Sequence, residues 1–496
     1  MTLRRGFALL ILVSFTALLC AAQTTNSPND PTWWDKYNYI RKNGASTFSA
    51  VAPTTGTKSA NVDVSNECGP QSETYITIDP NQPKILAGGS NEIFRLPMRG
   101  YFSFNGGSSW GGIDLPLPTA QGANSYNFGS DPTLAYDRFN NLYYGYIVVY
   151  FGAGNGVNGS AMAVARSQDF GQSYAATFFG FLSGSNHFND KPMITTGPNP
   201  ANPSRDNVYI AWDAASGGST GGGIRVAASS DSAATFTITR ADDPSGPGRS
   251  IGAVPFVAPD NTLWVAWNDY SANAIMVNSS ADGGATWGSP QVIAYKTLAF
   301  QANIPAESFR GALVYPSCAA DRSAGPFRGR LYCSWMDMGP NGSTDIYLSH
   351  FTPGHDAAWS VPEAVTDPIG VVDRFNHWLA VDAITGDVNV SFYDTRNDTT
   401  GARTMTDVYF TQSKDGGTTF RSPNTRVTNV SSNEHDCAGL FPCAFINYGN
   451  QQGDYEGLAS FNGVSHPIWT DSRNNTQTSS SCTVGAMEEV FSATVK

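Results

Sequence analysis

Short runs of β-branched and aromatic residues recur in pairs along most of the chain. Many alternate apolar with polar positions, and Gly, Asn, Asp or Pro separates the members of a pair. This pattern is typical of β-strands joined by tight turns, so it predicts an all-β chain. The pairs are Tyr75–Asp79 with Lys84–Gly88, Thr133–Asp137 with Leu142–Val149, Pro192–Thr196 with Asn207–Trp212, Val254–Ala258 with Leu263–Trp267, Pro316–Asp321 with Arg330–Trp335, Leu379–Asp382 with Val388–Tyr393, and Leu458–Phe461 with His466–Trp469.

A short motif follows most of these pairs. It reads S-x-D-x-G-x-T-W at Ser280–Trp287 and recurs at Ser413–Phe420. Looser copies are Ser103–Trp110, Ser167–Tyr174 and Ser229–Phe236, and a further stretch, Ser349–Trp359, keeps the ends of the motif but has lost its middle. The Asp side chain can accept hydrogen bonds from its own turn, and the Gly supplies a positive φ. We therefore interpret the motif as a structural hairpin turn rather than as a catalytic or metal-binding site.

The strand pairs and the motifs together make units of roughly 50–65 residues with four strands each. Seven units predict a seven-bladed β-propeller of four-stranded antiparallel blades, and a six-bladed ring with one irregular insertion is the alternative. The seventh unit is short, with Glu489–Val495 as its third strand. Ala60–Ser65 can supply the fourth strand, so that the two ends of the chain close the ring and leave no exposed edge.

The N-terminus has the features of a secretory signal peptide. Arg4 and Arg5 precede an apolar run, Phe7–Leu19, and small residues follow up to Ala22. We expect cleavage near Ala22 and a secreted or periplasmic protein, with a lipid anchor at Cys20 as the alternative. The predicted organisation is then a signal peptide over 1–22, a linker over 23–57 and the propeller over 58–496.

The charge of the chain limits the classes of partner that it can bind, and its cysteines predict disulfides. The formal net charge of −12 argues against binding to nucleic acid or to anionic membranes. No later run reaches about 18 apolar residues, so we expect no membrane insertion. We also expect the protein to be a monomer. Six cysteines remain after the signal peptide, and an exported chain favours disulfides. The expected pairs are Cys318–Cys333, Cys437–Cys443 and Cys68–Cys482.

The repeated motif resembles the Asp box, or bacterial neuraminidase repeat, of the sialidase superfamily, and the resemblance spans residues 58–496. It implies a propeller with Asp-box turns. It also implies a site in which three arginines grip a sugar carboxylate, an aspartate acts as acid, and a glutamate activates a tyrosine nucleophile. Phe94–Pro97 is similar to the F-R-I-P element that supplies the first arginine, here Arg95. It has Leu in place of Ile, and it follows the second strand of its unit instead of preceding the first.

Acidic and polar residues stand six positions before the end of the first strand in most units. They are Glu73, Asp131, Asp190, Tyr315, Asn376 and Glu456, with Gly252 or Ala253 in the fourth unit. This spacing predicts a ring around one mouth of the central channel. Crowded carboxylates raise one another's pKa, and a structural Ca²⁺ ion is compatible with such a ring. No other cofactor is expected.

Read as a glycosidase site, the ring assigns Asp131 as the acid, Tyr315 as the nucleophile and Glu307 or Glu73 as its base. Arg249, Arg310, Arg374 and Arg95 would bind the substrate carboxylate. The predicted function is a secreted, sialidase-like exo-glycosidase that acts on extracellular glycans. The alternatives are a non-catalytic glycan- or protein-binding propeller of the cell envelope, and hydrolysis or lysis of a polysaccharide, because propellers without sialidase activity also carry Asp boxes.

Overall fold

The computed structural model describes most of the chain beyond its N-terminal region. It covers residues 40, 42–45, 61–67, 69–119, 124–152, 157–183, 189–214, 222–243, 250–308, 311–435, 452–473 and 488–496. The expected signal peptide, most of the expected linker, and Cys68, Cys437, Cys443 and Cys482 lie outside the described residues. Within the described part of the chain, no helix is long and apolar enough to cross a membrane.

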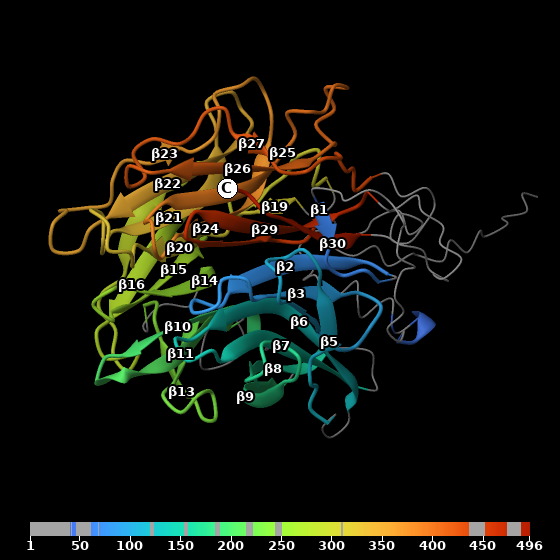
Figure 1. Ribbon diagram of the computed structural model, residues 1–496, viewed down its shortest axis with the longest axis vertical. Helices are drawn as coiled ribbons and strands as arrows, with labels where there is room; N and C mark the ends of the chain where they lie inside the picture. The colour runs from blue at the N-terminus through green and yellow to red at the C-terminus, as the bar shows by residue number, and fades with distance from the viewer. Residues whose placement is uncertain are drawn as a thin grey trace, which may run out of the picture.

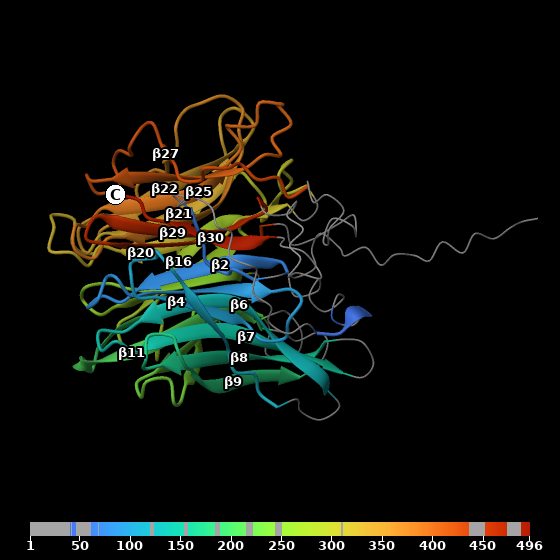
Figure 2. The same ribbon diagram turned by 45° about the vertical axis from the view of Figure 1, so that its right-hand side comes forward.

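Seven four-stranded antiparallel sheets form the blades of a propeller, which confirms the predicted number (Figures 1 and 2). Blade 1 contains β2 (Gln71–Ile78), β3 (Leu86–Glu92), β4 (Arg99–Ser103) and β5 (Gly111–Asp114). Blade 2 contains β6 (Asn124–Tyr136), β7 (Leu142–Gly152), β8 (Val157–Ser167) and β9 (Ala175–Ser183). Blade 3 contains β10 (Asn189–Asn199), β11 (Asn202–Ala214), β12 (Gly223–Ser229) and β13 (Thr237–Arg240).

The remaining blades follow the same order. Blade 4 contains β14 (Ser250–Val257), β15 (Leu263–Asp269), β16 (Ala274–Ser280) and β17 (Gln291–Tyr295). A small hairpin of β18 (Gln301–Ala302) and β19 (Ala312–Leu313) comes next. Blade 5 contains β20 (Ser317–Ala320), β21 (Leu331–Met338), β22 (Thr344–Phe351) and β23 (Glu363–Ala364). Blade 6 contains β24 (Arg374–Val381), β25 (Val388–Asp394), β26 (Asp407–Ser413) and β27 (Thr425–Arg426).

The two ends of the described propeller close the ring. Blade 7 contains β28 (Gly457–Phe461), β29 (Val464–Asp471), β30 (Glu489–Ala493) and, as its outer strand, β1 (Asn61–Asp63). β1 pairs with β30 in the register Asn61↔Ala493, so the predicted closure is confirmed. Figures 1 and 2 both show β2 of the first blade beside β29 of the last.

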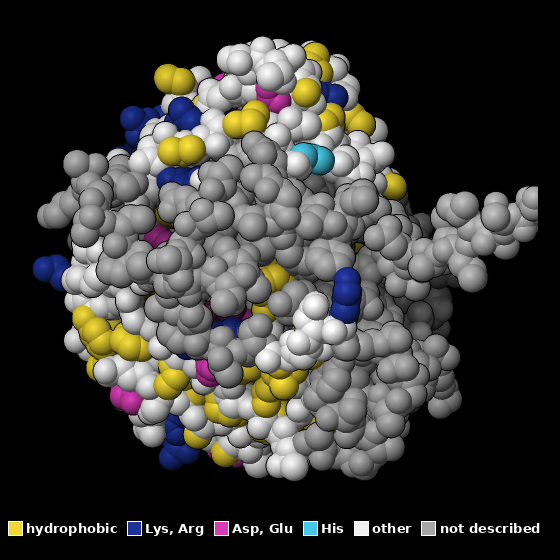
Figure 3. Space-filling model, turned by 90° about the vertical axis from the view of Figure 1, so that its right-hand side faces the viewer, with side chains coloured by type: hydrophobic (Ala, Val, Ile, Leu, Met, Phe, Trp, Pro, Cys, Tyr) yellow, Lys and Arg dark blue, Asp and Glu magenta, His cyan; other side chains and the backbone are white. Residues whose placement is uncertain are grey.

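The propeller has two distinct faces. The first strand of each blade begins on what we call the mouth face, and Figure 3 looks onto it. The S-x-D motifs lie on the opposite, turn face. In the copy at β16, Asp282 Oδ1 accepts hydrogen bonds from Ser280 Oγ (2.7 Å) and from the backbone N–H of Thr286 (2.8 Å). The hydroxyl of Thr286 also donates to Asp282 Oδ2 (2.6 Å). This bond most of all, together with the other two, lowers the pKa of Asp282 to about 2. The aspartate therefore serves the turn.

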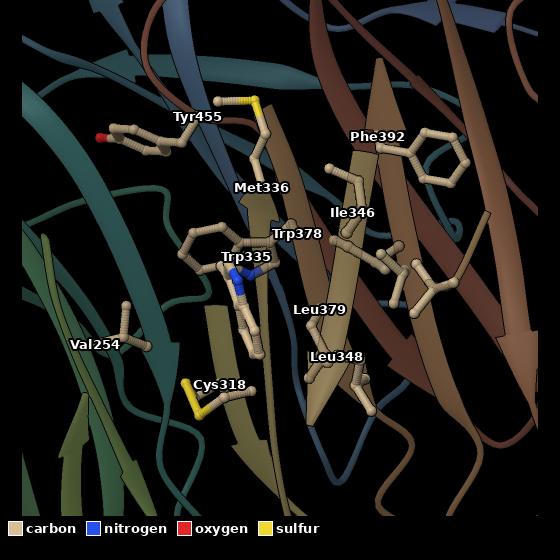
Figure 4. Close-up of a cluster of buried hydrophobic side chains, with 14 of the residues drawn as sticks. Val254, Cys318, Trp335, Met336, Ile346, Leu348, Trp378, Leu379, Phe392 and Tyr455 are labelled. Carbon is tan, nitrogen blue, oxygen red and sulfur yellow. A yellow bond between two sulfur atoms is a disulfide. The ribbon is translucent and has the colours of Figure 1, made fainter. Parts of the chain in front are cut away.

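Large aromatic side chains fill the space within and between blades. Trp212, Trp267, Trp335 and Trp469 each lie near the end of a second strand and are almost completely buried. Figure 4 shows Trp335 and Trp378 together in one such cluster, near Cys318. Each buried ring removes a large apolar area from water, so these rings supply much of the cohesion between sheets. Cys318 and Cys333 occupy paired positions on β20 and β21 and form a disulfide, as predicted.

Candidate functional site

A buried cluster at the mouth face surrounds Lys191, which lies near the start of β10. The backbone N–H of Lys191 donates to Asp131 Oδ2 (3.2 Å) and to Asp190 Oδ1 (3.1 Å). Its Nζ lies 2.9 Å from the centre of the Tyr455 ring and 4.4 Å from the centre of the Tyr315 ring. Residues of blades 2 and 3 thus meet residues of the segments that lead into blades 5 and 7.

A repeated β-bulge places the inner residues of this cluster. In β2, β6, β10, β14 and β24, two residues interrupt the pairing with the second strand, and the first of them has a positive φ. These residues are Glu73 (51°), Asp131 (62°), Lys191 (51°), Gly252 (72°) and Asn376 (43°). A bulge redirects side chains, and a left-handed backbone is costly for residues other than Gly. Five blades therefore share this bulge at the mouth, and the backbone is strained in the four that carry a residue other than Gly there.

The bulge corrects one predicted ring position. In blade 3 it falls on Lys191, so the position predicted at Asp190 is wrong by one residue. The spacing was counted back from Thr196 as the strand end, but β10 continues to Asn199 and gives no fixed reference there. Asp190 instead sits directly opposite Asp213 of β11. Two acidic side chains therefore face each other across the first two strands of the blade.

A hydrogen-bonded network joins the bulges of blades 1 and 2. Asn91, near the end of β3, donates from Nδ2 to Glu73 Oε2 (2.8 Å). Its Oδ1 accepts the backbone N–H of Asp131 (2.7 Å). The hydroxyl of Ser130 donates to Asp131 Oδ1 (2.8 Å). Asn91 thereby holds Glu73 and Asp131 in fixed positions on neighbouring blades, and both side chains are buried.

The segment Gln452–Glu456, which leads into β28, contacts several other blades at the mouth. The carbonyl oxygen of Gly453 accepts a hydrogen bond from Asn376 Nδ2 (2.8 Å). The hydroxyl of Tyr455 donates to the carbonyl oxygen of Pro132 (3.0 Å), and Figure 4 shows its ring above Trp378. A Cβ on Gly453 would lie 2.5 Å from Cγ of Glu73, so only glycine fits this crossing. The segment therefore links blades 1, 2 and 6.

Burial and crowding shift the acid–base behaviour of the cluster. Burial raises the pKa of Asp190 well above its usual range, and the nearby carboxylates of Asp131 and Asp213 raise it further. Burial likewise raises the pKa of Asp213. Burial lowers the pKa of Lys191 to about 8, although the carboxylates of Glu73, Asp131 and Asp190 counteract it. Asp190 is the member of this set that keeps appreciable contact with solvent.

Four arginines were predicted to bind the substrate carboxylate. The two that lie within the described residues, Arg374 and Arg95, are in different parts of the propeller. Arg374 is buried between Asp345 (3.2 Å) and Asp394 (3.0 Å) at the edge between blades 5 and 6. Arg95 is buried in blade 1, where it pairs with Asp114 and, at 3.1 Å, with Glu67. Each guanidinium is thus engaged by carboxylates of its own neighbourhood, and the structure does not bring the two together.

The other predicted residues have separate locations. Glu307 is buried in the turn between β18 and β19, where its backbone N–H donates to the carbonyl of Ile304. Glu456 is buried between blades 6 and 7, where desolvation raises its pKa and the nearby Ser391 side chain partly counteracts that increase. Arg249 and Arg310 lie outside the described residues.

Sequence reasoning missed Asn91, Gly453 and Tyr455 as members of the cluster. Lys191 directly follows Asp190, the residue predicted at the ring position of its unit. A signal for the segment exists in the chain, because Tyr455 directly precedes Glu456, a predicted ring position, and Gly453 lies three positions before it. In the part of the chain that the structure describes, no group of three or more His, Cys, Asp or Glu side chains is placed to hold a metal ion.

The chain is similar to known proteins in three-dimensional structure, but its sequence alone finds no match. No family model matches the sequence, and no curated protein matches it. A leech intramolecular trans-sialidase complexed with 2,7-anhydro-Neu5Ac is 12% identical, with a TM-score of 0.46 over 75% of this chain and 71% of that one. The intramolecular trans-sialidase from Ruminococcus gnavus is 10% identical, with a TM-score of 0.44 over 67% and 91%. The α-L-arabinanase of Penicillium chrysogenum, complexed with arabinobiose, is 11% identical, with a TM-score of 0.44 over 68% and 94%.

Proposed function

We propose that the protein is an exported glycoside hydrolase that cleaves extracellular glycans at the mouth face. Asp190 is its proton donor, and Asp131 is the partner carboxylate. The observation that carries the proposal is the convergence of these two carboxyl groups on one backbone N–H, that of Lys191, at 3.1 and 3.2 Å. Most glycoside hydrolases cleave the glycosidic bond with two carboxyl groups, of which one is protonated and donates its proton while the other is ionised.

The environments of the two groups support different roles. The raised pKa of Asp190 lets it hold its proton to a higher pH than an exposed aspartate does, and its partial exposure lets it reach a glycosidic oxygen. Asp131 accepts hydrogen bonds from Ser130 and from the N–H of Lys191, which suits a carboxylate that receives a proton or stabilises positive charge on the sugar. The predicted acid, Asp131, thus becomes the partner in this proposal, and Asp190 takes over as the acid.

Tyr315 belongs to the same cluster and remains the proposed nucleophile of a sialidase-like variant of the mechanism. Its ring packs under the Lys191 ammonium, which would stabilise negative charge on a phenolate oxygen. The separation of Arg95 from Arg374 gives no support to a three-arginine grip. We therefore propose glycan hydrolysis without assigning sialic acid as the sugar.

The direct test is product release by the purified, full-length mature chain from a panel of sialylated, neutral, amino and uronic oligosaccharides. We expect release of sugar from at least one of them, and loss of about 10²-fold or more in kcat for Asp190→Asn and Asp131→Asn. Asp260→Asn, in an exposed turn-face loop, is the matched control and should retain full activity. If the wild-type chain releases nothing, the hydrolase is overturned. Saturable binding without turnover that survives Tyr315→Phe would then establish a glycan-binding propeller.

A further inference from the structure

The seven turns that join first and second strands surround the turn-face end of the propeller axis, and the structure describes all of them. In blades 2 and 5 an arginine directly follows the aspartate that begins this turn, at Arg138 and Arg322. In blade 3 the pairing of β10 with β11 continues out to Asn199 and Asn202, and β11 then carries Asp206. Charged residues of three blades therefore stand at this end of the axis.

Arg138 and Asp206 form a close ion pair between blades 2 and 3. Nη2 of Arg138 lies 2.6 Å from Oδ1 of Asp206, and Nε donates to the same oxygen at 2.8 Å. The backbone N–H of Arg138 donates to the other oxygen, Oδ2, at 2.9 Å. One residue thus engages both oxygens of this buried carboxylate, while 45% of the Arg138 side chain stays exposed.

Arg322 lies beside this pair and is partly buried. Its guanidinium makes no hydrogen bond and no ion pair with any residue that the structure describes. The groups that act on it electrostatically are Asp206, Arg138 and Arg328. Arg328 is fixed over the same turn, because its Nη1 donates to the carbonyl oxygens of Arg322 (2.7 Å) and Ser323 (2.8 Å). Two guanidinium groups and one carboxylate that is already paired therefore surround Arg322.

This environment is unfavourable for the charge on Arg322. Burial lowers its pKa, the Asp206 carboxylate counteracts that decrease, and the guanidinium groups of Arg138 and Arg328 add to it. An arginine still keeps its charge at neutral pH. The turn thus holds a cation that has lost part of its hydration and is repelled by its like-charged neighbours. An oxyanion bound there would offset both costs, because guanidinium groups donate strong, paired hydrogen bonds to such anions.

We propose that Arg322, Arg138 and Arg328 form an oxyanion site at the turn face, which binds phosphate or sulfate as an ion or as an ester group on a glycan. The three guanidinium groups come from two blades, so together they can reach several oxygens of a tetrahedral anion, whereas a flat carboxylate offers only two.

The acidity of the whole chain does not exclude such a site. The formal net charge of −12 repels anions at a distance. At physiological ionic strength, however, interactions between exposed charges are largely screened beyond about 8 Å, so the groups that touch the anion decide its affinity. The site lies on the face away from the mouth, and binding there does not depend on the proposed hydrolase.

The test is calorimetric titration of the full-length mature chain with phosphate, sulfate, galactose sulfate and, as the neutral control, galactose, all at one ionic strength in chloride buffer. We expect saturable binding of the anions at millimolar concentrations. Arg322→Gln should weaken it by about tenfold or more, because charge-assisted hydrogen bonds are lost. Asp206→Asn should strengthen it several-fold, because a competing carboxylate disappears while the amide oxygen still accepts from Arg138. Arg421→Gln, at an exposed arginine of the blade 6 turn motif, is the matched control and should bind as the wild type does.

The outcomes distinguish the source of the anion and the site itself. Galactose sulfate that binds more tightly than sulfate supports a glycan ester as the ligand, and equal affinities support the ion; both results support the site. Anions that do not saturate, or that bind Arg322→Gln as tightly as the wild type, overturn it. Thermal unfolding gives a second readout, since phosphate should raise the Tm of the wild type more than that of Arg322→Gln. Without phosphate the two proteins should unfold at similar temperatures, which confirms that the variant is folded.

Discussion

Arg473 and Asn61 hold the ring closed: both terminal nitrogens of the Arg473 guanidinium donate to Oδ1 of Asn61, each at 3.1 Å. Arg473 follows β29, and Asn61 is the first residue of β1, so the contact joins strands separated by almost the whole chain. The same guanidinium pairs with Asp471 at 2.5 Å. Asn61 also donates from Nδ2 to the carbonyl of Val427 in the neighbouring blade (2.9 Å). The Arg473 guanidinium thus links its own blade, through Asp471, to the strand that closes the ring.

Asn61→Ala should therefore weaken ring closure. The substitution removes one acceptor of Arg473, which keeps Asp471, and leaves the carbonyl of Val427 without this donor. We expect a loss of about 1–3 kcal/mol in the free energy of unfolding, because buried polar groups lose partners. Urea unfolding followed by tryptophan fluorescence measures it. Asn341→Ala, in an exposed turn, is the control and should change stability by less than about 0.5 kcal/mol. Equal effects at the two positions would contradict a closing role for Asn61.

Gly252 makes room for Tyr315 at the mouth. A Cβ at position 252 would lie 2.2 Å from Cδ1 of Tyr315, and the φ of Gly252 is 72°. Gly252→Ala should destabilise the protein by about 2–4 kcal/mol, because it adds a steric clash to an unfavourable backbone conformation. Gly401→Ala is a matched control, since Gly401 has a φ of 77° and no other atom lies within 4 Å of the place that a Cβ would occupy there. Thermal unfolding should show a clearly larger loss at 252 than at 401.

A second variant isolates the clash. In the background of Tyr315→Ala, the ring is gone and only the backbone cost of Gly252→Ala remains. The loss caused by Gly252→Ala should then fall to that of Gly401→Ala. If it stays as large as in the wild-type background, the two residues do not compete for space and the packing argument fails.

The blades could be predicted because they depend on local patterns, and their closure because the seventh unit is one strand short and Ala60–Ser65 can supply that strand. Strand pairs, turn motifs and the pairing of Cys318 with Cys333 are all visible within one unit of the chain. The mouth cluster could not be predicted in this way. Its membership depends on where the bulge falls in blade 3, and the bulge places Lys191 at the ring position that the spacing assigns to Asp190. It also depends on Tyr455, which reaches Pro132 from 323 positions away. The partners of Arg374 likewise come from tertiary packing, which residue type alone does not reveal.

Ring closure should also respond to pH through Asp63 of β1. Burial raises the pKa of Asp63 to about 6 from the usual value near 4. A carboxyl group whose folded-state pKa is raised stabilises the fold fully below its unfolded pKa and loses that contribution as pH rises through its folded pKa. Stability should therefore fall between about pH 4 and pH 6. Urea unfolding across this range should show a smaller fall for Asp63→Asn, whose side chain does not titrate. Parallel profiles for the two proteins would be evidence against this assignment.

The pH dependence of cleavage should report the proton on Asp190. A proton donor works only while it is protonated, so activity should fall on the alkaline side as pH rises through the raised pKa of Asp190. Part of that increase comes from the Asp213 carboxylate, which sits opposite on β11. Asp213→Asn removes this charge and keeps the shape, so the alkaline limb of kcat/KM should move to lower pH. Asp260→Asn should leave it in place. An alkaline limb that does not move in Asp213→Asn would exclude Asp190 as the group that loses the proton.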